Sequence, residues 1–243
     1  MPNWLTARPI AHRGLHDSAS GVIENTASAF EAAIAGNYAI ECDVQLSADG
    51  EAMVHHDDVL GRLTDGAGRL DAMQAAELRR VPFKATADRM LTLADLCALV
   101  AGRATVLLEL KSRFDGDVRL PRRVAAVLKD YSGPAAAMSF DPGQITALRD
   151  FSPDVLRGLV AWRPDRTREH NPSTGSAARF VLQALAARLQ FLAYRVDDLP
   201  APVPSFARNV LGLPLLTWTV RTAEAQRRAE QHADQMIFEG LRP

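Results

Sequence analysis

The chain alternates between short apolar runs and segments with helical spacing along most of its length. Runs such as TVLLEL at 105–110 are continuous and β-prone, which is typical of strands buried on both faces of a parallel sheet. No linker-like stretch interrupts the 243 residues. We count eight strands once the return arm of one hairpin is set aside. The pattern therefore predicts one (β/α)8 barrel, a TIM barrel, that spans residues 1–243 as a single domain.

Two stretches fall outside this alternation. Residues 57–96 contain glycine turns and one short amphipathic helix, so we expect an inserted, cap-like segment after the hairpin of the second strand. We expect it to pack over the barrel mouth, where such additions vary the specificity of barrel proteins. Residues 163–175 are polar and rich in turn-forming residues, and they predict a loop beside the mouth.

The stretch 38–58 carries two carboxylates, two histidines and a turn signal. Strand side chains alternate, so Glu41 and Asp43 are expected on the same face. The Asp49-Gly50 pair predicts a two-residue type I′ turn, which would place Asp43 opposite His56 and Glu41 opposite Asp58. The alternative is an edge hairpin whose acids are simply solvated.

Composition limits the possible partners. The net charge is −1, with 28 basic and 29 acidic residues, so nothing favours nucleic acid or stable membrane association. We expect a small-molecule partner instead. Cys42 and Cys97 are expected in the core. The first residues lack the features of a secretory signal, which predicts a cytoplasmic location, and the oligomeric state is left open.

Several polar residues are expected together at the C-terminal strand ends, where barrel proteins place their functional groups. Three carboxylates without a thiol partner form a hard oxygen site that suits one divalent cation, Mg²⁺ or Ca²⁺. Histidines beside such an ion suit acid–base work, and fixed cations suit a phosphoryl group. The pattern indicates phosphoester chemistry, and the residues are His12, Arg13, Glu41, Asp43, Glu109 and Lys111.

The sequence resembles the glycerophosphodiester phosphodiesterase family. The motifs that carry the resemblance are AHRG (11–14), ENTASAF (24–30), IECDVQLSADG (40–50), HHDDVLGRLTDGAG (55–68), LELK (108–111), SF (139–140) and WTVR (218–221). The resemblance implies a barrel with an insertion after the HD motif, a divalent ion, and hydrolysis of glycerophosphodiesters to glycerol 3-phosphate and an alcohol.

By position, the resemblance implies a role for each matched residue. His12 and His56 correspond to the general acid and base. The remaining matches are Glu41, Asp43 and Glu109 as metal ligands, Arg13 and Lys111 as phosphate contacts, Trp218 as a ring that stacks on the glycerol or the alcohol, and Glu24 as a residue that orients the others or caps a helix.

Three positions depart from the family pattern. The HD motif is followed by GRLTDG rather than by RTT or RTS, Glu239 stands where an ITD acid is common, and Arg221 replaces a frequent asparagine. Two other readings stay open. One is a lipid phosphodiesterase of the lysophospholipase D or sphingomyelinase D type, against which the polar stretch 163–175 argues mildly. The other is a non-catalytic phosphoester-binding barrel, although none of the expected residues is missing.

Overall fold

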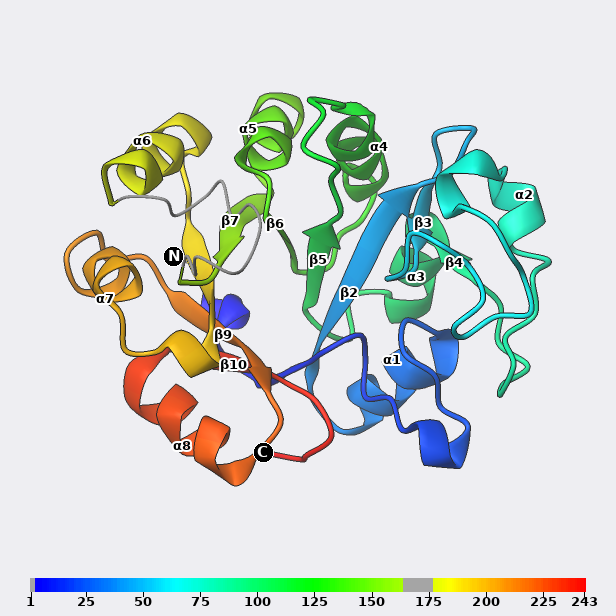
Figure 1. Cartoon of the computed structure of the whole chain (residues 1–243), viewed down its shortest axis with the longest axis horizontal. Coiled ribbons are helices and arrows are strands. Elements are labelled where there is room, and N and C mark those ends of the chain that lie inside the picture. The colour runs from blue at the N-terminus through cyan, green and yellow to red at the C-terminus, as the bar shows by residue number, and fades with distance from the viewer. Residues whose placement is uncertain (1–2, 164–176) are drawn as a thin grey trace.

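Eight parallel strands close into a barrel in the computed structural model, which describes residues 3–163 and 177–243 (Figure 1). The first strand pairs with both the second and the last, so the eight parallel strands form a closed ring. This confirms the predicted TIM barrel. The barrel strands are β1 (Ile10–Ala11), β2 (Ala39–Leu46), β5 (Val106–Leu110), β6 (Ala135–Ser139), β7 (Leu156–Ala161), β8 (Phe191–Arg195), β9 (Leu215–Val220) and β10 (Gln235–Phe238).

Helices surround the barrel and cover its outer face (Figure 1). They begin where the sequence offers caps: the Thr92 side chain accepts from the Asp95 amide, and the Asp141 side chain accepts from the Gly143 amide. The helices are α1 (Ala27–Ala35), α3 (Leu93–Val100), α4 (Arg119–Leu128), α5 (Pro142–Phe151), α6 (Ala177–Ala187), α7 (Pro202–Asn209) and α8 (Ala223–His232). Residues 164–176, which include most of the polar stretch predicted as a loop beside the mouth, lie outside the described part of the chain.

The first two strands differ in length, and this shapes the barrel mouth. Strand β1 has two residues, whereas β2 has eight and continues beyond its pairing with β1. The far half of β2 pairs with the antiparallel strand β3 (Ala52–Val54), which in turn pairs with β4 (Leu91–Thr92). The loop that follows β1 lies against β2, where the Gly14 amide donates to the Glu41 carbonyl at 3.2 Å.

The predicted register of the β2–β3 hairpin is wrong. Val44 pairs with Val54, so paired residue numbers sum to one less than a two-residue turn at Asp49-Gly50 requires. The connection is a three-residue loop, closed by the Glu51 carbonyl that accepts from the Ser47 amide at 2.9 Å. The Ser47 hydroxyl accepts from the Glu51 amide, and Gly50 has a φ of 82°, which is the left-handed residue that such loops require.

The residues between β3 and β4 form a small unit of their own. It contains a 3-10 turn, η3 (Leu70–Ala72), and one short helix, α2 (Ala75–Leu78), and it packs on the hairpin side of the barrel (Figure 1). Its buried residues form a separate apolar cluster together with Ile23 and Met53; they are Leu60, Leu70, Ala75, Leu78, Phe83 and Met90.

Apolar side chains pack together inside the barrel, and Phe191 is among them. The Phe191 ring is fully buried there, next to Gly158 on the neighbouring strand. A Cβ at Gly158 would lie 2.3 Å from the Phe191 ring, so only glycine fits beside this phenylalanine. The two residues are a matched large and small pair.

We expect Gly158→Ala to destabilise the protein by about 1–3 kcal/mol, which is the usual cost of overpacking a core. The reason is the 2.3 Å approach of the added methyl group to the Phe191 ring. Urea unfolding measures the change, and the double variant Gly158→Ala/Phe191→Leu should recover part of the loss. Equal stability of the wild type and Gly158→Ala would contradict the tight packing of this pair.

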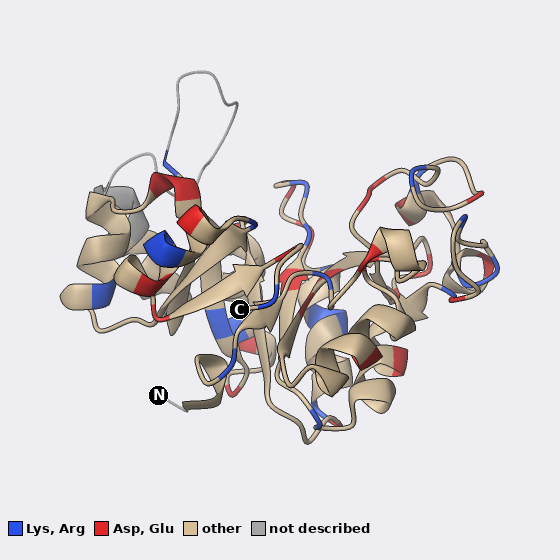
Figure 2. Ribbon diagram, turned by 90° about the horizontal axis from the view of Figure 1, so that it is seen from below, with Lys and Arg blue, Asp and Glu red and all other residues tan. Residues whose placement is uncertain are grey.

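No helix in the described ranges is long and apolar enough to cross a membrane. In the view of Figure 2, basic and acidic residues are interspersed along the ribbon. This distribution agrees with the small net charge of the chain.

Candidate active site

Three neighbouring strands carry most of the predicted functional residues. Strands β1, β2 and β5 are adjacent in the sheet, and the register sets Asp43 beside Glu109. Their C-terminal ends place six predicted residues together: His12 and Arg13 after β1, Glu41 and Asp43 in β2, Glu109 in β5 and Lys111 after it.

The three predicted metal ligands converge. One carboxylate oxygen from each of Glu41, Asp43 and Glu109 lies within 4.8 Å of the other two, and all three residues are buried. Cys42, between the two acids in sequence, faces the helices and belongs to the outer apolar core. The strand alternation that predicted a shared face for Glu41 and Asp43 is therefore present in β2.

The pKa values of the two acids of β2 are shifted in opposite directions. Burial, with the charge of Asp43 beside it, raises the pKa of Glu41 to about 8. Burial would also raise the pKa of Asp43, but Lys111 and Arg13 outweigh it, so this pKa is lowered. Glu41 Oε2 accepts from the Arg13 amide at 2.9 Å, while its Oε1 is buried with no hydrogen-bond partner in the described part of the chain.

These features fit a hard divalent cation. All three ligands offer oxygen, which Mg²⁺ and Ca²⁺ prefer over nitrogen and sulfur. A buried, unpartnered carboxylate oxygen is costly unless something positive reaches it, and Glu41 Oε1 is such an atom. The donor set suits either ion.

Arg13 and Lys111 surround the same cluster. Lys111 Nζ lies 2.7 Å from Asp43 Oδ1 and 2.5 Å from Glu109 Oε1, and Arg13 Nε lies 3.2 Å from Asp43 Oδ2. Arg13 reaches this position because its backbone is left-handed, with a φ of 58°, which turns the chain sharply after β1. The two predicted phosphate contacts thus lie at the carboxylate cluster.

Asn25 is a site residue that sequence reasoning missed. It is fully buried, its Nδ2 donates to Asp43 Oδ2 at 2.8 Å, and its Oδ1 accepts from the Asp43 amide at 3.2 Å. The residue has a φ of 58°, a conformation in which asparagine is enriched. The ENT motif marks this position in the sequence. Strand and helix periodicity, however, do not predict that the Asn25 side chain points towards Asp43.

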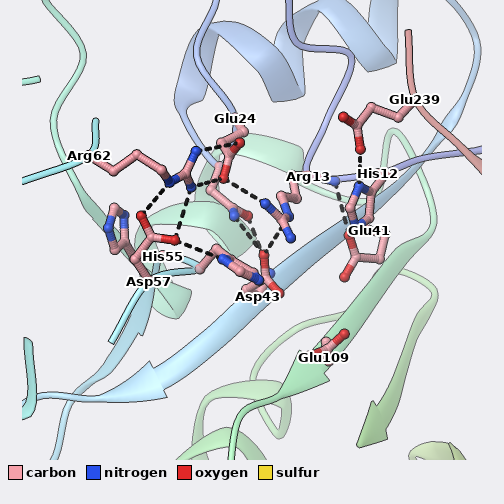
Figure 3. A network of polar contacts seen from close by, with 12 residues as sticks. His12, Arg13, Glu24, Glu41, Asp43, His55, Asp57, Arg62, Glu109 and Glu239 are labelled. Carbon is pink, nitrogen blue, oxygen red and sulfur yellow. Dashed lines mark hydrogen bonds and ion pairs between the residues drawn. The ribbon is translucent and has the colours of Figure 1, made fainter. Parts of the chain in front are cut away.

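His12 has an acidic partner on the last strand's loop. Its Nδ1 lies 2.7 Å from Glu239 Oε2, and its Nε2 lies 4.0 Å from Glu41 Oε2, so the second nitrogen faces the carboxylate cluster (Figure 3). Burial lowers the pKa of His12, but Glu239 and Glu41 outweigh it and the net shift is upward. Arg221 donates to the same Glu239 oxygen at 2.7 Å. Arg221 and Glu239, which both depart from the family pattern, therefore form a chain of polar contacts that ends at His12.

His56 also has an acidic partner. Its Nδ1 lies 2.9 Å from Asp57 Oδ1, and Arg62 Nε donates to Asp57 Oδ2 at 2.6 Å. Arg62 continues to Glu24, which also accepts from Arg13 at 2.8 Å (Figure 3). Glu24 thus links Arg62, on the His56 side, to Arg13 at the carboxylate cluster. The pKa of Glu24 is lowered because Arg62 and Arg13 outweigh burial.

The hairpin register does not explain the position of His56. The residue opposite Asp43 is His55, whose amide donates to the Asp43 carbonyl at 3.1 Å. Its side chain is buried, with its ring 6.3 Å from that of Phe83. Strand β3 ends at Val54, so strand alternation no longer orients either histidine. His56 is close enough to Asp43 to contribute to its lowered pKa.

Trp218 lies at the other side of the mouth. Its ring packs edge-on against Phe140, with centroids 5.5 Å apart, and near Trp162 at 6.4 Å. It lines a hollow of about 300 Å³ together with Trp162, Arg195, Asp197, Thr219 and Arg221.

Comparison with known proteins identifies relatives along the chain. Residues 12–238 match the model of the glycerophosphoryl diester phosphodiesterase family. A glycerophosphodiester phosphodiesterase of Caldanaerobacter subterraneus subsp. tengcongensis is 27% identical over 161 residues, which are 62% of this chain and 65% of that protein. Human glycerophosphodiester phosphodiesterase 1 is 22% identical over 250 residues, 92% of this chain and 74% of that protein.

Solved structures share the fold. An Oleispira antarctica phosphodiesterase in complex with the product sn-glycerol-3-phosphate superimposes with a TM-score of 0.79 at 22% identity, covering 97% of this chain and 94% of that chain. A Thermotoga maritima glycerophosphodiester phosphodiesterase gives a TM-score of 0.74 at 24% identity, covering 94% and 92%. The family model spans nearly the whole chain, from the first histidine to the last strand, and the chain therefore belongs to the glycerophosphoryl diester phosphodiesterase family.

Proposed function

We propose that this protein hydrolyses glycerophosphodiesters to glycerol 3-phosphate and an alcohol in a reaction that depends on a divalent cation. Family membership supports glycerophosphodiester hydrolysis. The observation that carries the finer assignment is the convergence of three buried carboxylates with Arg13 and Lys111. The glycerol 3-phosphate bound to the Oleispira antarctica relative supports the product.

Glu41, Asp43 and Glu109 would hold the cation. When bound, the cation supplies positive charge that stabilises a phosphoryl group as negative charge develops on it. Arg13 and Lys111 bind the non-bridging phosphate oxygens, because a guanidinium and an ammonium beside the cluster offer donors where the cluster's own charge would repel an anion. The substrate phosphate is thereby fixed between the two histidines.

His12 and His56 divide the proton transfers. One takes the proton from the attacking oxygen, and the other gives a proton to the departing alkoxide, so that the bond from phosphorus to the alcohol breaks and water is added overall. Each ring has its Nδ1 against a carboxylate, at 2.7 Å for Glu239 and 2.9 Å for Asp57. With Nδ1 bonded to a carboxylate, the Nε2 atom is the one left for the substrate. The attacker is water or the neighbouring glycerol hydroxyl.

Trp218 belongs to the glycerol side of the substrate. Its ring lines the aromatic hollow near the end of β9, and an indole face suits the carbon–hydrogen edge of a glycerol chain. Arg195 and Asp197, which also line this hollow, form an ion pair at 2.8 Å and offer both donors and acceptors to hydroxyl groups.

A substrate panel tests this function. Purified protein with Mg²⁺ or Ca²⁺ is assayed against several glycerophosphodiesters, a lysophospholipid and glycerol 3-phosphate itself. We expect release of glycerol 3-phosphate from the diesters and no hydrolysis of the monoester. Faster cleavage of the lysophospholipid would favour a lipid phosphodiesterase, and no cleavage of any substrate would favour a phosphoester-binding barrel.

The Glu239 carboxylate should raise the pKa of His12 and thereby affect activity. We expect Glu239→Gln to lower kcat/KM by on the order of tenfold, as removal of the partner of a site residue usually does. Without this carboxylate the pKa of His12 falls, because Glu41 and Asp43 are then the remaining acids that oppose burial and Arg13. The limb of the pH profile that belongs to His12 should move to lower pH, whether His12 acts as acid or as base.

A matched control is Glu51→Gln, which removes the partner of Arg123 outside the cluster. Its pH profile should equal that of the wild type. A wild-type profile for Glu239→Gln would show that the 2.7 Å contact with His12 has no role in the reaction.

A further inference from the structure

One arginine of the segment between β3 and β4 reaches the candidate active site. Arg62 Nε donates to Asp57 Oδ2 at 2.6 Å, and its Nη2 donates to Asp57 Oδ1 at 3.0 Å. On the other side, Nη2 donates to Glu24 Oε1 at 2.6 Å and Nη1 donates to Glu24 Oε2 at 3.3 Å (Figure 3). One guanidinium therefore holds two carboxylates from different loops, one after β3 and one between β1 and α1.

The Asp57 carboxylate is oriented by Arg62. Gln45 fixes the backbone nearby, since its Nε2 donates to the carbonyls of His55 at 2.8 Å and Asp57 at 3.1 Å. Arg62 contacts both carboxylate oxygens and so fixes the plane of the side chain. Burial would raise the pKa of Asp57, but the bonds from Arg62 and His56 outweigh it and lower this pKa to about 2. The carboxylate is therefore ionised at neutral pH.

The His56 ring is oriented in turn by Asp57. Its Nδ1 lies 2.9 Å from Asp57 Oδ1. The His56 side chain is 34% exposed, whereas that of His12 is 12% exposed, so packing restrains His56 less than His12. A site side chain is kept in its productive orientation by the residues that contact it. The position of His56 Nε2 therefore depends on the orientation of the Asp57 carboxylate.

The Glu24 branch depends less on Arg62. Glu24 Oε1 also accepts from Arg13 Nη1 at 2.8 Å. Arg13 has a second anchor, because its Nε lies 3.2 Å from Asp43 Oδ2. Loss of Arg62 would leave both of these Arg13 contacts in place. We therefore expect Arg62 to affect His56 more than it affects Arg13.

The fold of the segment does not need the Arg62 guanidinium. The Leu60 amide donates to the Gly68 carbonyl at 2.9 Å, and Leu60 is buried in the apolar cluster of the segment. On the other side of Arg62, the Lys84 amide donates to the Leu63 carbonyl at 2.9 Å. The Arg62 side chain is itself 48% exposed, so its replacement leaves no buried cavity.

We propose that Arg62 is a positioning residue for the reaction, which orients Asp57 and, through Asp57, the imidazole of His56. The inference rests on the proposed diesterase activity and adds to it a residue of the inserted segment. A guanidinium suits this role because its planar set of donors can bond two carboxylates at once, whereas an ammonium group is a point charge. Because Arg62 acts through Asp57, its effect depends on the presence of the His56 ring.

A double-mutant cycle tests this dependence. Arg62→Ala should lower kcat for glycerophosphodiesters by on the order of 10- to 100-fold, the usual effect of losing a residue that orients a site side chain. The change in KM should be smaller, because Arg13 remains bound. In a His56→Ala background the same substitution should have almost no further effect, whereas in a His12→Ala background it should keep its full effect. Arg62→Lys should recover only part of the loss.

Arg69→Ala is the matched control. Arg69 lies in the same segment, its side chain is 47% exposed, and it pairs with Asp71 at 3.0 Å, so its loss should leave kcat unchanged. Arg62→Gln, which keeps a polar side chain, repeats the cycle with a milder change. Equal losses from Arg62→Ala in the His56→Ala and His12→Ala backgrounds, or no loss in the wild type, would overturn the inference and leave the diesterase activity standing. Inactivity of the wild type towards every glycerophosphodiester would instead overturn the proposed function.

Discussion

Replacement of either histidine by alanine should lower kcat/KM for glycerophosphodiesters by on the order of 10²-fold or more, the usual contribution of a general acid or base. Both rings are anchored through Nδ1 to a carboxylate, at 2.7 Å for His12 and 2.9 Å for His56. The substitutions therefore remove the proton-transfer group and leave the carboxylate cluster in place. Steady-state kinetics with saturating Mg²⁺ or Ca²⁺ measures the effect.

The nature of the leaving group separates the two histidines. A p-nitrophenyl ester of glycerol phosphate releases an anion that needs little protonation, so it should restore the variant that lacks the acid far more than the variant that lacks the base. The variant that recovers more with this ester therefore identifies the histidine that acts as the acid. Equal responses of His12→Ala and His56→Ala, or near wild-type rates in either, would contradict the division of roles.

Substitution of any one of the three carboxylates should weaken the effect of divalent cations. Glu41→Gln, Asp43→Asn and Glu109→Gln each remove one charge from a set of oxygens that lie within 4.8 Å of one another. Loss of one carboxylate weakens an oxygen site for Mg²⁺ or Ca²⁺ directly. We expect activity to fall by on the order of 10²-fold or more at a cation concentration that saturates the wild type, because phosphoryl-group stabilisation is lost.

Thermal unfolding provides a readout that does not depend on activity. A cation at 100 times its Kd stabilises the wild type by about 2.7 kcal/mol, whereas the variants should show little shift. In the absence of a cation, Glu41→Gln should not lower the thermal stability. Burial beside Asp43 raises the pKa of Glu41 to about 8, above its unfolded value, so at neutral pH folding requires this carboxyl to take up a proton, a cost that glutamine does not carry. The cation-free variant should unfold at a temperature equal to or above that of the cation-free wild type.

The matched control is Glu31→Gln, which loses a surface ion pair with Arg103 and should respond to cations as the wild type does. If Glu41→Gln and the wild type gain the same thermal stability from Mg²⁺ and from Ca²⁺, the carboxylate cluster is not the cation site.

The fold could be predicted because it depends on periodic signals. Continuous apolar strands such as Val106–Leu110, each separated by a helix, have few arrangements other than a closed parallel barrel. The shared face of Glu41 and Asp43 followed from the same regularity. These statements required only the period of a strand and the order of the elements.

The hairpin register could not be predicted in this way. The Asp49-Gly50 pair fits a two-residue turn, but the Ser47 hydroxyl bonds the Glu51 amide and adds one residue to the loop. A one-residue shift exchanges the faces of a strand, so the pairing of Asp43 with His56 was wrong although both residues lie near the cluster. The resemblance to the family, rather than the turn, selected His56.

The supporting residues were the least predictable part of the site. Asn25 and Arg13 have left-handed backbones, and their directions are set by loops that have no period. Asp57 and Arg62 act through contacts between the inserted segment and Glu24, which are distant in sequence. Glu239 departs from the family pattern and lies 227 residues from His12 in the sequence. Only closure of the barrel brings the two residues together.

The most direct test of the account is the identity of the phosphorus product formed with and without a divalent cation. Protein dialysed against chelator is incubated with glycerophosphoethanolamine and followed by phosphorus NMR before and after Mg²⁺ or Ca²⁺ is restored. The account predicts no turnover in chelator, and conversion to glycerol 3-phosphate, directly or through a cyclic phosphate, once the cation is present. Full activity in excess chelator, or release of inorganic phosphate or phosphoethanolamine instead, would contradict it.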